Sequence, residues 1–373
     1  MGKQYILTII LAGFISAEAS AKKIANKFKS EGMSVGVEVL SDRFDVPWGF
    51  DFINDSQLII SERKGTMSLL DIKSGMIKTV KGLPKVYHGG QGGLLDVAVH
   101  PNFSKTKLIY FTYAIDFEDG HTTRLGMAKL KGQYLANFKV LFTALPPGNR
   151  SIHFGSRIAF DKKGHIYFSV GDRGKRDRAQ DLKTHSGKII RLNLDGSVPK
   201  DNPFVNRKGV KKEIWTYGHR NPQGLTRHPI TGQIWEQEHG PRGGDEINLL
   251  RKGYNYGWPI ITYGKEYWGP SIGTTHKKGL VQPVYHYTPS IAPSGLAIYA
   301  GSKFPAWQGN VFSGALKLTH INRLVLGKKN RVLKEERLLK GMDERIRNIK
   351  VGLDGLIYFS SDSGKIMRLI PVN

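Results

Sequence analysis

The stretch RIAFDKKGHIYFSVGD, residues 157–172, decides the fold. It has an apolar start, a polar turn with a glycine, and a second apolar run, which is typical of two short strands joined by a hairpin. Five further copies of this pattern are WGFDFINDSQLIISE (48–62), LLDVAVHPNFSKTKLIYFTY (94–113), GLTRHPITGQIWEQE (224–238), GLAIYAGSKFPAWQGNVFSGAL (295–316) and NIKVGLDGLIYFSSD (348–362).

The spacing of these copies predicts a ring. Their starts lie roughly 45 to 70 residues apart, which is in the range of propeller blades with some long loops. A four-stranded blade cannot bury both faces alone, whereas blades stacked around an axis bury them against each other. A pair of β-sandwiches or an irregular all-β protein is the alternative, since single hairpins are common. The number and even coverage of the copies favour an all-β fold, a six-bladed β-propeller with four-stranded antiparallel blades, closed by pairing of a first strand near residues 37–40 with the last blade.

The N-terminus has the pattern of an export signal. Lys3 precedes the apolar run YILTIILAGFI and the small residues AEASA, which is the order of a cleaved signal peptide. The alternative is a membrane anchor, but a spanning helix needs about 20 apolar residues. We therefore expect a signal peptide over residues 1–21, a single propeller domain over residues 22–373, a periplasmic or secreted location, and no stable membrane insertion after cleavage.

Composition narrows the chemistry further. The 373 residues include no cysteine, which excludes disulfides and thiolate metal sites. The formal net charge of +25 is a feature of nucleic-acid-binding proteins. However, the Lys and Arg residues are scattered, and an exported protein does not meet nucleic acid, so we expect a solvated basic surface and no nucleic-acid partner.

Polar residues recur where each predicted blade begins. In a propeller these starts meet at one mouth of the central channel, where a site can draw on several blades. Each residue alone is explained more simply as a satisfied hydrogen-bonding group or a surface ion pair. Together they predict a basic pocket with one neutral base, suited to a ligand with several carboxylates. The residues are Gln91, His153, Arg220, Asn221, Lys317, Arg345 and Arg347.

The segment EHGPRGGDEINLLRKGYNYGWP, residues 238–259, is a candidate metal loop. Asp245 and Glu246 offer hard oxygen ligands, and Gly240, Pro241 and Tyr256 offer backbone carbonyls. In a chain without cysteine the natural ion for such donors is Ca²⁺. The loop has no EF-hand spacing, so a surface turn whose acids pair with nearby arginines is an equally good interpretation.

Four segments carry a resemblance to a known family. GHRNPQGL, the loop of residues 238–259, IAPSGLAIY, and HFGSRIAFDKKGHIYFSVGD resemble the soluble quinoprotein sugar dehydrogenases of the glucose/sorbosone dehydrogenase family. The nearest similarity is to the aldose sugar dehydrogenases that use pyrroloquinoline quinone (PQQ), and it covers about residues 44–369. The resemblance implies a six-bladed propeller, an oxidoreductase acting on CH–OH groups, and the cofactors PQQ and Ca²⁺.

The resemblance also implies residue roles. His153 would be the catalytic base, assisted by Arg220. The Ca²⁺ that touches PQQ would take carbonyls of Gly240 and Pro241. A second, structural Ca²⁺ would take Glu246 and Tyr256, with Asp245 as a further candidate. The implied PQQ contacts are Gln91, Arg220, Asn221, Tyr267, Lys317, Arg345 and Arg347.

One position departs from the family pattern. In the glucose dehydrogenase branch an Asp precedes the catalytic His, whereas here Ile152 precedes His153. The base therefore lacks an adjacent carboxylate that would stabilise an imidazolium. Either Asp172 or Asp96 is expected to orient it instead, or the rate is lower.

The leading functional hypothesis is oxidation of the C1 hydroxyl of an aldose to a lactone by hydride transfer to PQQ, with His153 as base and an external electron acceptor. Two alternatives remain. One is a Ca²⁺-dependent lactonase on a similar propeller, whose channel would be lined by acidic rather than basic residues. The other is a non-catalytic propeller that binds a protein or polysaccharide. The preferred sugar, and whether the chain is a monomer or a homodimer, do not follow from the sequence.

Overall fold

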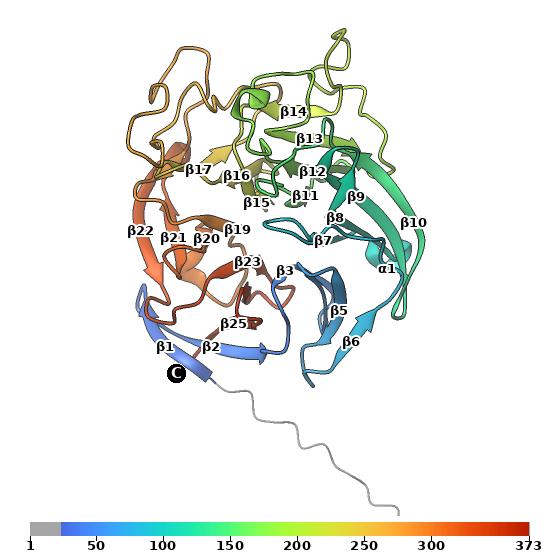
Figure 1. Ribbon diagram of the computed structural model, residues 1–373. Coiled ribbons are helices and arrows are strands. Elements are labelled where there is room, and N and C mark those ends of the chain that lie inside the picture. The colour runs from blue at the N-terminus through green and yellow to red at the C-terminus, as the bar shows by residue number, and fades with distance from the viewer. Residues whose placement is uncertain (1–23, 373) are drawn as a thin grey trace, which may run out of the picture.

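The computed structural model describes residues 24–372 as a ring of six antiparallel β-sheets around a central axis (Figure 1). The predicted six-bladed propeller is therefore confirmed. Helical structure among these residues is limited to α1 (Phe103–Thr106) and three single 3₁₀ turns, η1 (Arg176–Ala179), η2 (Pro305–Trp307) and η3 (Lys328–Asn330). The predicted signal peptide lies outside the described residues, and within them no helix is long and apolar enough to cross a membrane.

Each of the first five blades is formed by strands that follow one another in the chain, from the channel outward. The first three blades are β3 (Pro47–Asn54), β4 (Gln57–Glu62), β5 (Thr66–Asp71) and β6 (Ile77–Val80); β7 (Leu94–Val99), β8 (Leu108–Phe117), β9 (Gly120–Lys131) and β10 (Tyr134–Thr143); and β11 (Ile158–Phe160), β12 (His165–Val170), β13 (Lys188–Asn193) and β14 (Ile214–Tyr217). The fourth and fifth blades are β15 (Pro222–Arg227), β16 (Ile234–Glu238), β17 (Asp245–Leu249) and β18 (Tyr285–Tyr287); and β19 (Pro293–Ile298), β20 (Val311–Ala315), β21 (Ile321–Leu326) and β22 (Val332–Leu338).

The sixth blade closes the ring with strands from both ends of the chain. Its sheet contains β23 (Ile346–Val351), β24 (Ile357–Ser361) and β25 (Ile366–Pro371), followed by β2 (Met33–Ser41) and β1 (Ile24–Ser30). Val37 of β2 pairs with Leu369 of β25 in antiparallel register. The predicted closure through residues 37–40 is therefore confirmed, and β1 adds a fifth strand at the outer edge.

Apolar side chains fill the space between neighbouring blades. Ile59 and Leu69 of the first blade share a buried cluster with Val97 and Phe111 of the second. The fourth and fifth blades share a similar cluster. Burying both faces of every sheet in this way stabilises the ring without disulfides. The innermost strand of each blade thereby positions the polar residues at the start of that blade, and these residues meet at one end of the channel.

Candidate active site

Two neighbouring cavities lie where the inner strands begin. The axial cavity, of about 190 Å³, lies in the channel and takes residues from all six blades. The outer cavity, of about 400 Å³, lies beside it, and Gln91 lines both. Of the residues predicted from the sequence, the two cavities bring together Gln91, His153, Arg220, Asn221, Pro241, Tyr267, Arg345 and Arg347.

His153 and Asp172 form a hydrogen-bonded pair in the wall of the outer cavity. The Nδ1 atom of His153 lies 2.7 Å from Oδ1 of Asp172, and their side chains are only 12% and 2% exposed. Asp172 is held in turn by the amide of Gly174 at 2.8 Å and by the indole N–H of Trp258 at 2.9 Å. Of the two carboxylates considered from the sequence, it is Asp172 that orients His153.

The backbone around His153 is shaped for this contact. His153 has a positive φ of 54°, a conformation that non-glycine residues adopt rarely and that is often found at functional sites. Its amide donates to the side-chain oxygen of Gln91 at 2.8 Å. A Cβ atom at Gly171 would lie 2.2 Å from the carbonyl oxygen of His153, so only glycine lets the end of β12 pass beneath the histidine.

Burial and charge keep the imidazole neutral. Burial lowers the pKa of His153 below its ordinary value, and the hydrogen bond with Asp172 only partly opposes this. Burial alone would raise the pKa of Asp172, but its hydrogen bond with His153 and the charge of Arg220 outweigh burial and hold that pKa below its usual range. With the Nδ1 proton directed at Asp172, the Nε2 atom of His153 is left as a proton acceptor.

The axial cavity has a cationic wall. Arg345 and Arg347 both bind Asp362, through Nε–Oδ2 at 3.0 Å and Nε–Oδ1 at 2.7 Å. One carboxylate therefore offsets two guanidinium groups. Arg63 lines the same cavity, and its Nε atom is buried with no hydrogen-bond partner among the described residues. The wall is left with unbalanced positive charge and a free donor, which fits a ligand bearing carboxylates.

Arg220 and Asn221 join the two cavities to the loop of residues 238–259. The guanidinium of Arg220 donates to the carbonyl oxygen of Gly240 at 2.9 Å and lies over the ring of Trp258. Asn221 accepts a hydrogen bond from the amide of Gly155 at 3.3 Å. The predicted Arg-Asn pair therefore lies at the junction of the third and fourth blades.

Two predicted residues sit at the margin of the site. Lys317 is exposed and follows Leu316, and it is Leu316 that lines the axial cavity. Tyr267 is 66% exposed at the rim of the outer cavity, next to Trp268, which is 75% exposed. An exposed aromatic pair at the rim offers flat apolar surface to a ligand entering the outer cavity.

Asp245 anchors the candidate metal loop to the rest of the chain. Its Oδ1 atom accepts from the amide of Gly240 at 2.9 Å. Its Oδ2 atom accepts from the hydroxyl of Ser290 at 2.6 Å and from the amide of Ala292 at 2.9 Å. Both oxygens are therefore occupied by the protein, and Asp245 holds the loop in shape.

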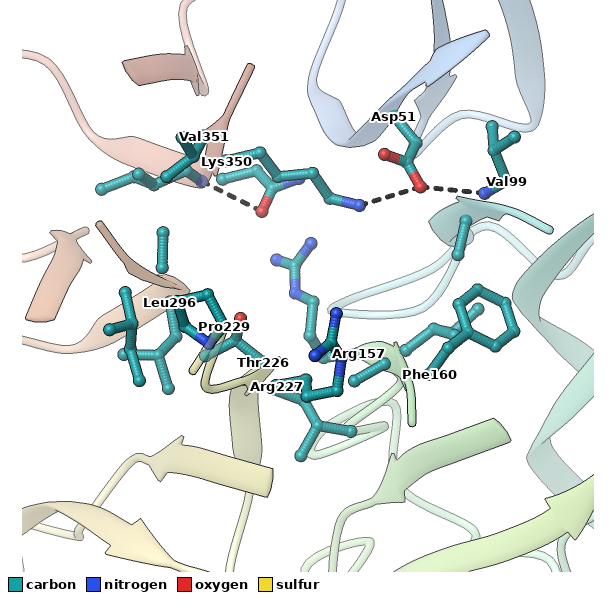
Figure 2. Close-up of a pocket in the computed structure, with 18 of the residues that line it drawn as sticks. Asp51, Val99, Arg157, Phe160, Thr226, Arg227, Pro229, Leu296, Lys350 and Val351 are labelled. Atoms are coloured by element: carbon teal, nitrogen blue, oxygen red, sulfur yellow. Dashed lines mark hydrogen bonds and ion pairs between the residues drawn. The ribbon is translucent and has the colours of Figure 1, made fainter. Parts of the chain in front are cut away.

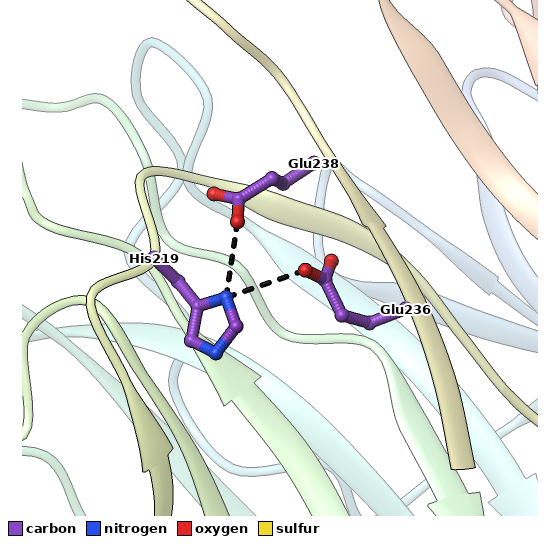
Figure 3. A group of neighbouring side chains, drawn as sticks. All are labelled: His219, Glu236 and Glu238. Carbon is purple, nitrogen blue, oxygen red and sulfur yellow. Dashed lines mark hydrogen bonds and ion pairs between the residues drawn. The ribbon is translucent and has the colours of Figure 1, made fainter. Parts of the chain in front are cut away.

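The first residue of this loop, Glu238, belongs to a buried cluster of carboxylates around His219 (Figure 3). The Nδ1 atom of His219 is 3.3 Å from Glu236 and 3.0 Å from Glu238. Oxygen atoms of the side chains of Glu236 and Asn248 are buried there with no hydrogen-bond partner among the described residues. Glu246 lies beside the cluster, bonded to Asn248 at 3.3 Å.

The cluster holds more negative charge than its environment tolerates. Burial and the charge of Glu238 raise the pKa of Glu236 to about 8 and raise that of Glu246 well above its usual range. Burial alone would lower the pKa of His219, but the two glutamates raise it to about 9. A divalent cation would supply positive charge that favours the ionised carboxylates, and unpartnered carboxylate and amide oxygens are the donors that Ca²⁺ prefers.

Tyr256 closes the cluster from one side. Its ring stacks on His219, and its hydroxyl is engaged by the backbone of Leu249 and Arg251 at 2.7 and 2.9 Å. The donor atom of Tyr256 that is left for a cation is therefore its backbone carbonyl oxygen. A small cavity of about 10 Å³, near the size of one water or ion, is lined by Glu238, Glu246 and Tyr256.

Several residues of the site were not predicted from the sequence. They are His219, Glu236, Glu238, Trp258, Arg63 and Asp362. One signal was available: Glu236 and Glu238 alternate in QIWEQEHG and so share one face of a strand. His219, Trp258, Asp362 and Arg63 lie within or next to the segments quoted above, but no spacing distinguishes them as site residues until the fold brings them together.

Comparisons with known proteins identify the family. A family model described as glucose / sorbosone dehydrogenase matches residues 44–368. The chain is 38% identical over 349 residues to the aldose sugar dehydrogenase YliI of Escherichia coli, covering 91% of this chain and 94% of the relative. The structure of the soluble aldose sugar dehydrogenase from Escherichia coli in the apo-form aligns with a TM-score of 0.88 at 38% identity over 91% of this chain and 100% of that one. The PQQ-bound form of the aldose sugar dehydrogenase from Streptomyces coelicolor aligns with a TM-score of 0.75 at 26% identity over 90% of this chain and 98% of that one.

Proposed function

Because the chain belongs to the glucose/sorbosone dehydrogenase family, we propose that it is a PQQ-dependent oxidoreductase that converts aldoses to lactones by oxidising the C1 hydroxyl. The observation that carries this proposal is the His153–Asp172 pair facing the outer cavity beside a cationic axial cavity. A neutral base and a wall for carboxylates are the two features that such an enzyme needs from its protein.

The cationic wall is suited to the tricarboxylate quinone. Arg63, Arg345 and Arg347 would hold its carboxylates, and Gln91 and Asn221 would supply amide hydrogen bonds. The carbonyl oxygens of Gly240 and Pro241, next to Arg220, would hold Ca²⁺ against the cofactor. When bound, PQQ supplies the two-electron acceptor and Ca²⁺ the Lewis acid.

The residues of the chain then place the sugar and move its proton. The Nε2 atom of His153 takes the proton of the C1 hydroxyl as the C1–H bond breaks. Asp172, which is hydrogen-bonded to Nδ1, stabilises the imidazolium that forms. It thereby takes the role of the aspartate that precedes the histidine in the glucose dehydrogenase branch, where this chain has Ile152. Tyr267 and Trp268 offer a surface for the sugar ring at the rim.

The direct test is reconstitution. Apo-protein loaded with PQQ and Ca²⁺ is expected to reduce an artificial electron-accepting dye when aldoses are added, and a panel of mono- and disaccharides would rank its substrates. A lactonase would instead hydrolyse lactones without any quinone, and a binding propeller would do neither. Dye reduction that stays at background with every aldose, despite bound PQQ, would contradict the proposal.

We further propose that the mature chain, residues 22–373, is a single catalytic domain that works in the periplasm or outside the cell. The sequence pattern of residues 1–21 supports this. An external electron acceptor would complete each turnover.

A structural Ca²⁺ is proposed at the cluster of Glu236, Glu238 and Glu246, with the carbonyl of Tyr256. Adding Ca²⁺ in the absence of PQQ is expected to raise the melting temperature by a few degrees, because a ligand at a hundred times its Kd stabilises the folded state by about 2.7 kcal/mol. Calorimetry in Ca²⁺ and in a chelator measures the shift. Glu246→Gln should remove most of it, whereas Glu118→Gln, at an exposed residue, should not. An unchanged melting temperature in Ca²⁺ would rule out the ion at this cluster.

A further inference from the structure

A third cavity lies at the opposite end of the channel, and we call it the far cavity. It has a volume of about 480 Å³ and is lined by the later residues of all six inner strands (Figure 2). In β3, for example, Trp48 lines the axial cavity and Asp51 lines the far cavity, and in β15 the corresponding residues are Gln223 and Arg227. The far cavity therefore shares the axis of the active site but opens away from it.

Arg157 separates the two ends of the channel. Its guanidinium bonds to Asp96 at 3.0 Å and donates to the carbonyl oxygens of Gln223 at 3.0 Å, Arg347 at 3.3 Å and Trp48 at 3.4 Å. Those three carbonyls belong to residues that line the axial cavity, while Arg157 itself lines the far cavity. A ligand in the far cavity would consequently lie behind Arg157, away from His153.

The charges around the far cavity do not balance. Lys350 is paired with Asp51 at 3.1 Å, and Arg157 is paired with Asp96. Arg227 is the third cation, and its Nη1 atom is buried without a hydrogen-bond partner among the described residues. Removing a charged donor from water is costly unless a partner replaces the water.

Asn348 adds a second free donor to the same cavity. The residue is 2% exposed, and its Oδ1 atom accepts from the amide of Ile349 at 3.0 Å. Its Nδ2 atom is left without a partner among residues 24–372. A buried amide of this kind normally has its donors satisfied, so a missing acceptor is indicated here.

Apart from Thr226, the side chains of the remaining wall are apolar. Val99, Phe160, Leu296 and Val351 surround the opening into which Arg157 and Arg227 project (Figure 2). A few polar donors in an apolar cavity of several hundred Å³ is the usual composition of a small-molecule site.

We propose that the far cavity binds a small organic carboxylate, whose oxygens accept hydrogen bonds from Arg227 and Asn348 and whose body packs on the apolar wall. The excess positive charge selects an anion, and the planar fork of a guanidinium suits a carboxylate. The apolar wall favours an organic anion over inorganic phosphate, which would leave that wall in contact with water. This site is independent of the proposed sugar oxidation.

The test is calorimetric titration of protein loaded with PQQ and Ca²⁺ and freed of excess cofactor, so that the cationic axial cavity is filled, with benzoate, benzamide and inorganic phosphate in a buffer free of other carboxylates. Benzoate is expected to bind at least tenfold more tightly than neutral benzamide of the same shape, and more tightly than phosphate. Equal binding of benzoate and benzamide would overturn the role of the charge. Phosphate binding as tightly as benzoate would overturn the role of the apolar wall, and no benzoate binding would overturn the site. This comparison uses the unaltered protein and does not depend on how a variant folds.

A variant then locates the site. Arg227→Gln should weaken benzoate binding roughly tenfold or more, because it removes the charge-assisted hydrogen bond. Arg331→Gln makes the same change in net charge at an exposed residue and should leave the affinity unchanged. Aldose oxidation by Arg227→Gln should also be unchanged, since Arg227 lies outside the active site. Benzoate bound equally well by Arg227→Gln and the unaltered protein would overturn the assignment.

Discussion

Replacing His153 with alanine is expected to lower kcat for aldose oxidation by roughly 10²–10⁴-fold in protein loaded with PQQ and Ca²⁺. The reason is that Nε2 of His153 is the neutral proton acceptor facing the outer cavity, held by Asp172 at 2.7 Å. Stopped-flow dye reduction measures the rate, and the absorbance of bound PQQ shows that the cofactor site is intact. Near-normal turnover by His153→Ala with PQQ bound would remove His153 from the mechanism.

The pH dependence separates a base from a merely structural histidine. A base must be neutral, so kcat/KM should rise with pH through the pKa of His153 and then level off. Since burial lowers that pKa, the plateau should begin below the pH expected for an ordinary histidine. Asp172→Asn removes an interaction that raises the pKa, so the acid limb should move to still lower pH while the plateau rate falls. A profile unmoved by Asp172→Asn would contradict the pairing.

The fold could be predicted because its signal repeats. Each of the six hairpin copies starts within two residues of an inner strand, as with Leu94 at the start of β7 and Asn348 in β23. A propeller forces these copies into equivalent places, so residues before each inner strand necessarily meet at one mouth. The family membership inferred from the sequence motifs is confirmed by the match over residues 44–368.

The site could be predicted only where it follows that repeat. Gln91, His153 and Arg347 lie at blade starts and are brought together as expected. Asp362, in contrast, lies in the turn after β24 and not at a blade start, although the pairing of Ile346 with Ser361 places it beside the arginines that it binds. Lys317 stays a prediction: it is exposed just after β20, and its neighbour Leu316 lines the axial cavity.

In the metal loop, burial separates the roles of two acidic residues that composition alone could not distinguish. Asp245 and Glu246 are adjacent acids, but alternation in β17 sends them to opposite sides. Asp245 turns into the backbone of the loop, where three donors satisfy it. Glu246 turns toward Glu238 and Asn248, where charge remains uncompensated. The sequence could not distinguish the two, because the decisive neighbours are set by the fold: Ser290 and Ala292 for Asp245, and Glu238 on the paired strand β16 for Glu246.

Replacing Asp96 with alanine is expected to lower the free energy of unfolding by about 3–5 kcal/mol, because it leaves the buried guanidinium of Arg157 without its counter-charge. Asp96 is fully buried and Arg157 is 2% exposed, so water cannot compensate for the loss. Chemical denaturation followed by tryptophan fluorescence measures the change. Asp201→Ala is the matched control: Asp201 also pairs with an arginine, at 2.8 Å, but its side chain is 65% exposed, so the expected cost is only about 0–1 kcal/mol.

The double variant Asp96→Leu with Arg157→Met tests the cause. Removing both charges should recover much of the lost stability, since an apolar pair of similar size avoids the cost of an unpaired buried ion. The site should nonetheless be damaged, because Arg157 also donates to the carbonyls of Trp48, Gln223 and Arg347, which line the axial cavity. Recovered stability with weakened PQQ binding would show that Arg157 joins the blades and shapes the site at once. If Asp96→Ala were no more destabilising than Asp201→Ala, Arg157 would not be the electrostatic link between the blades.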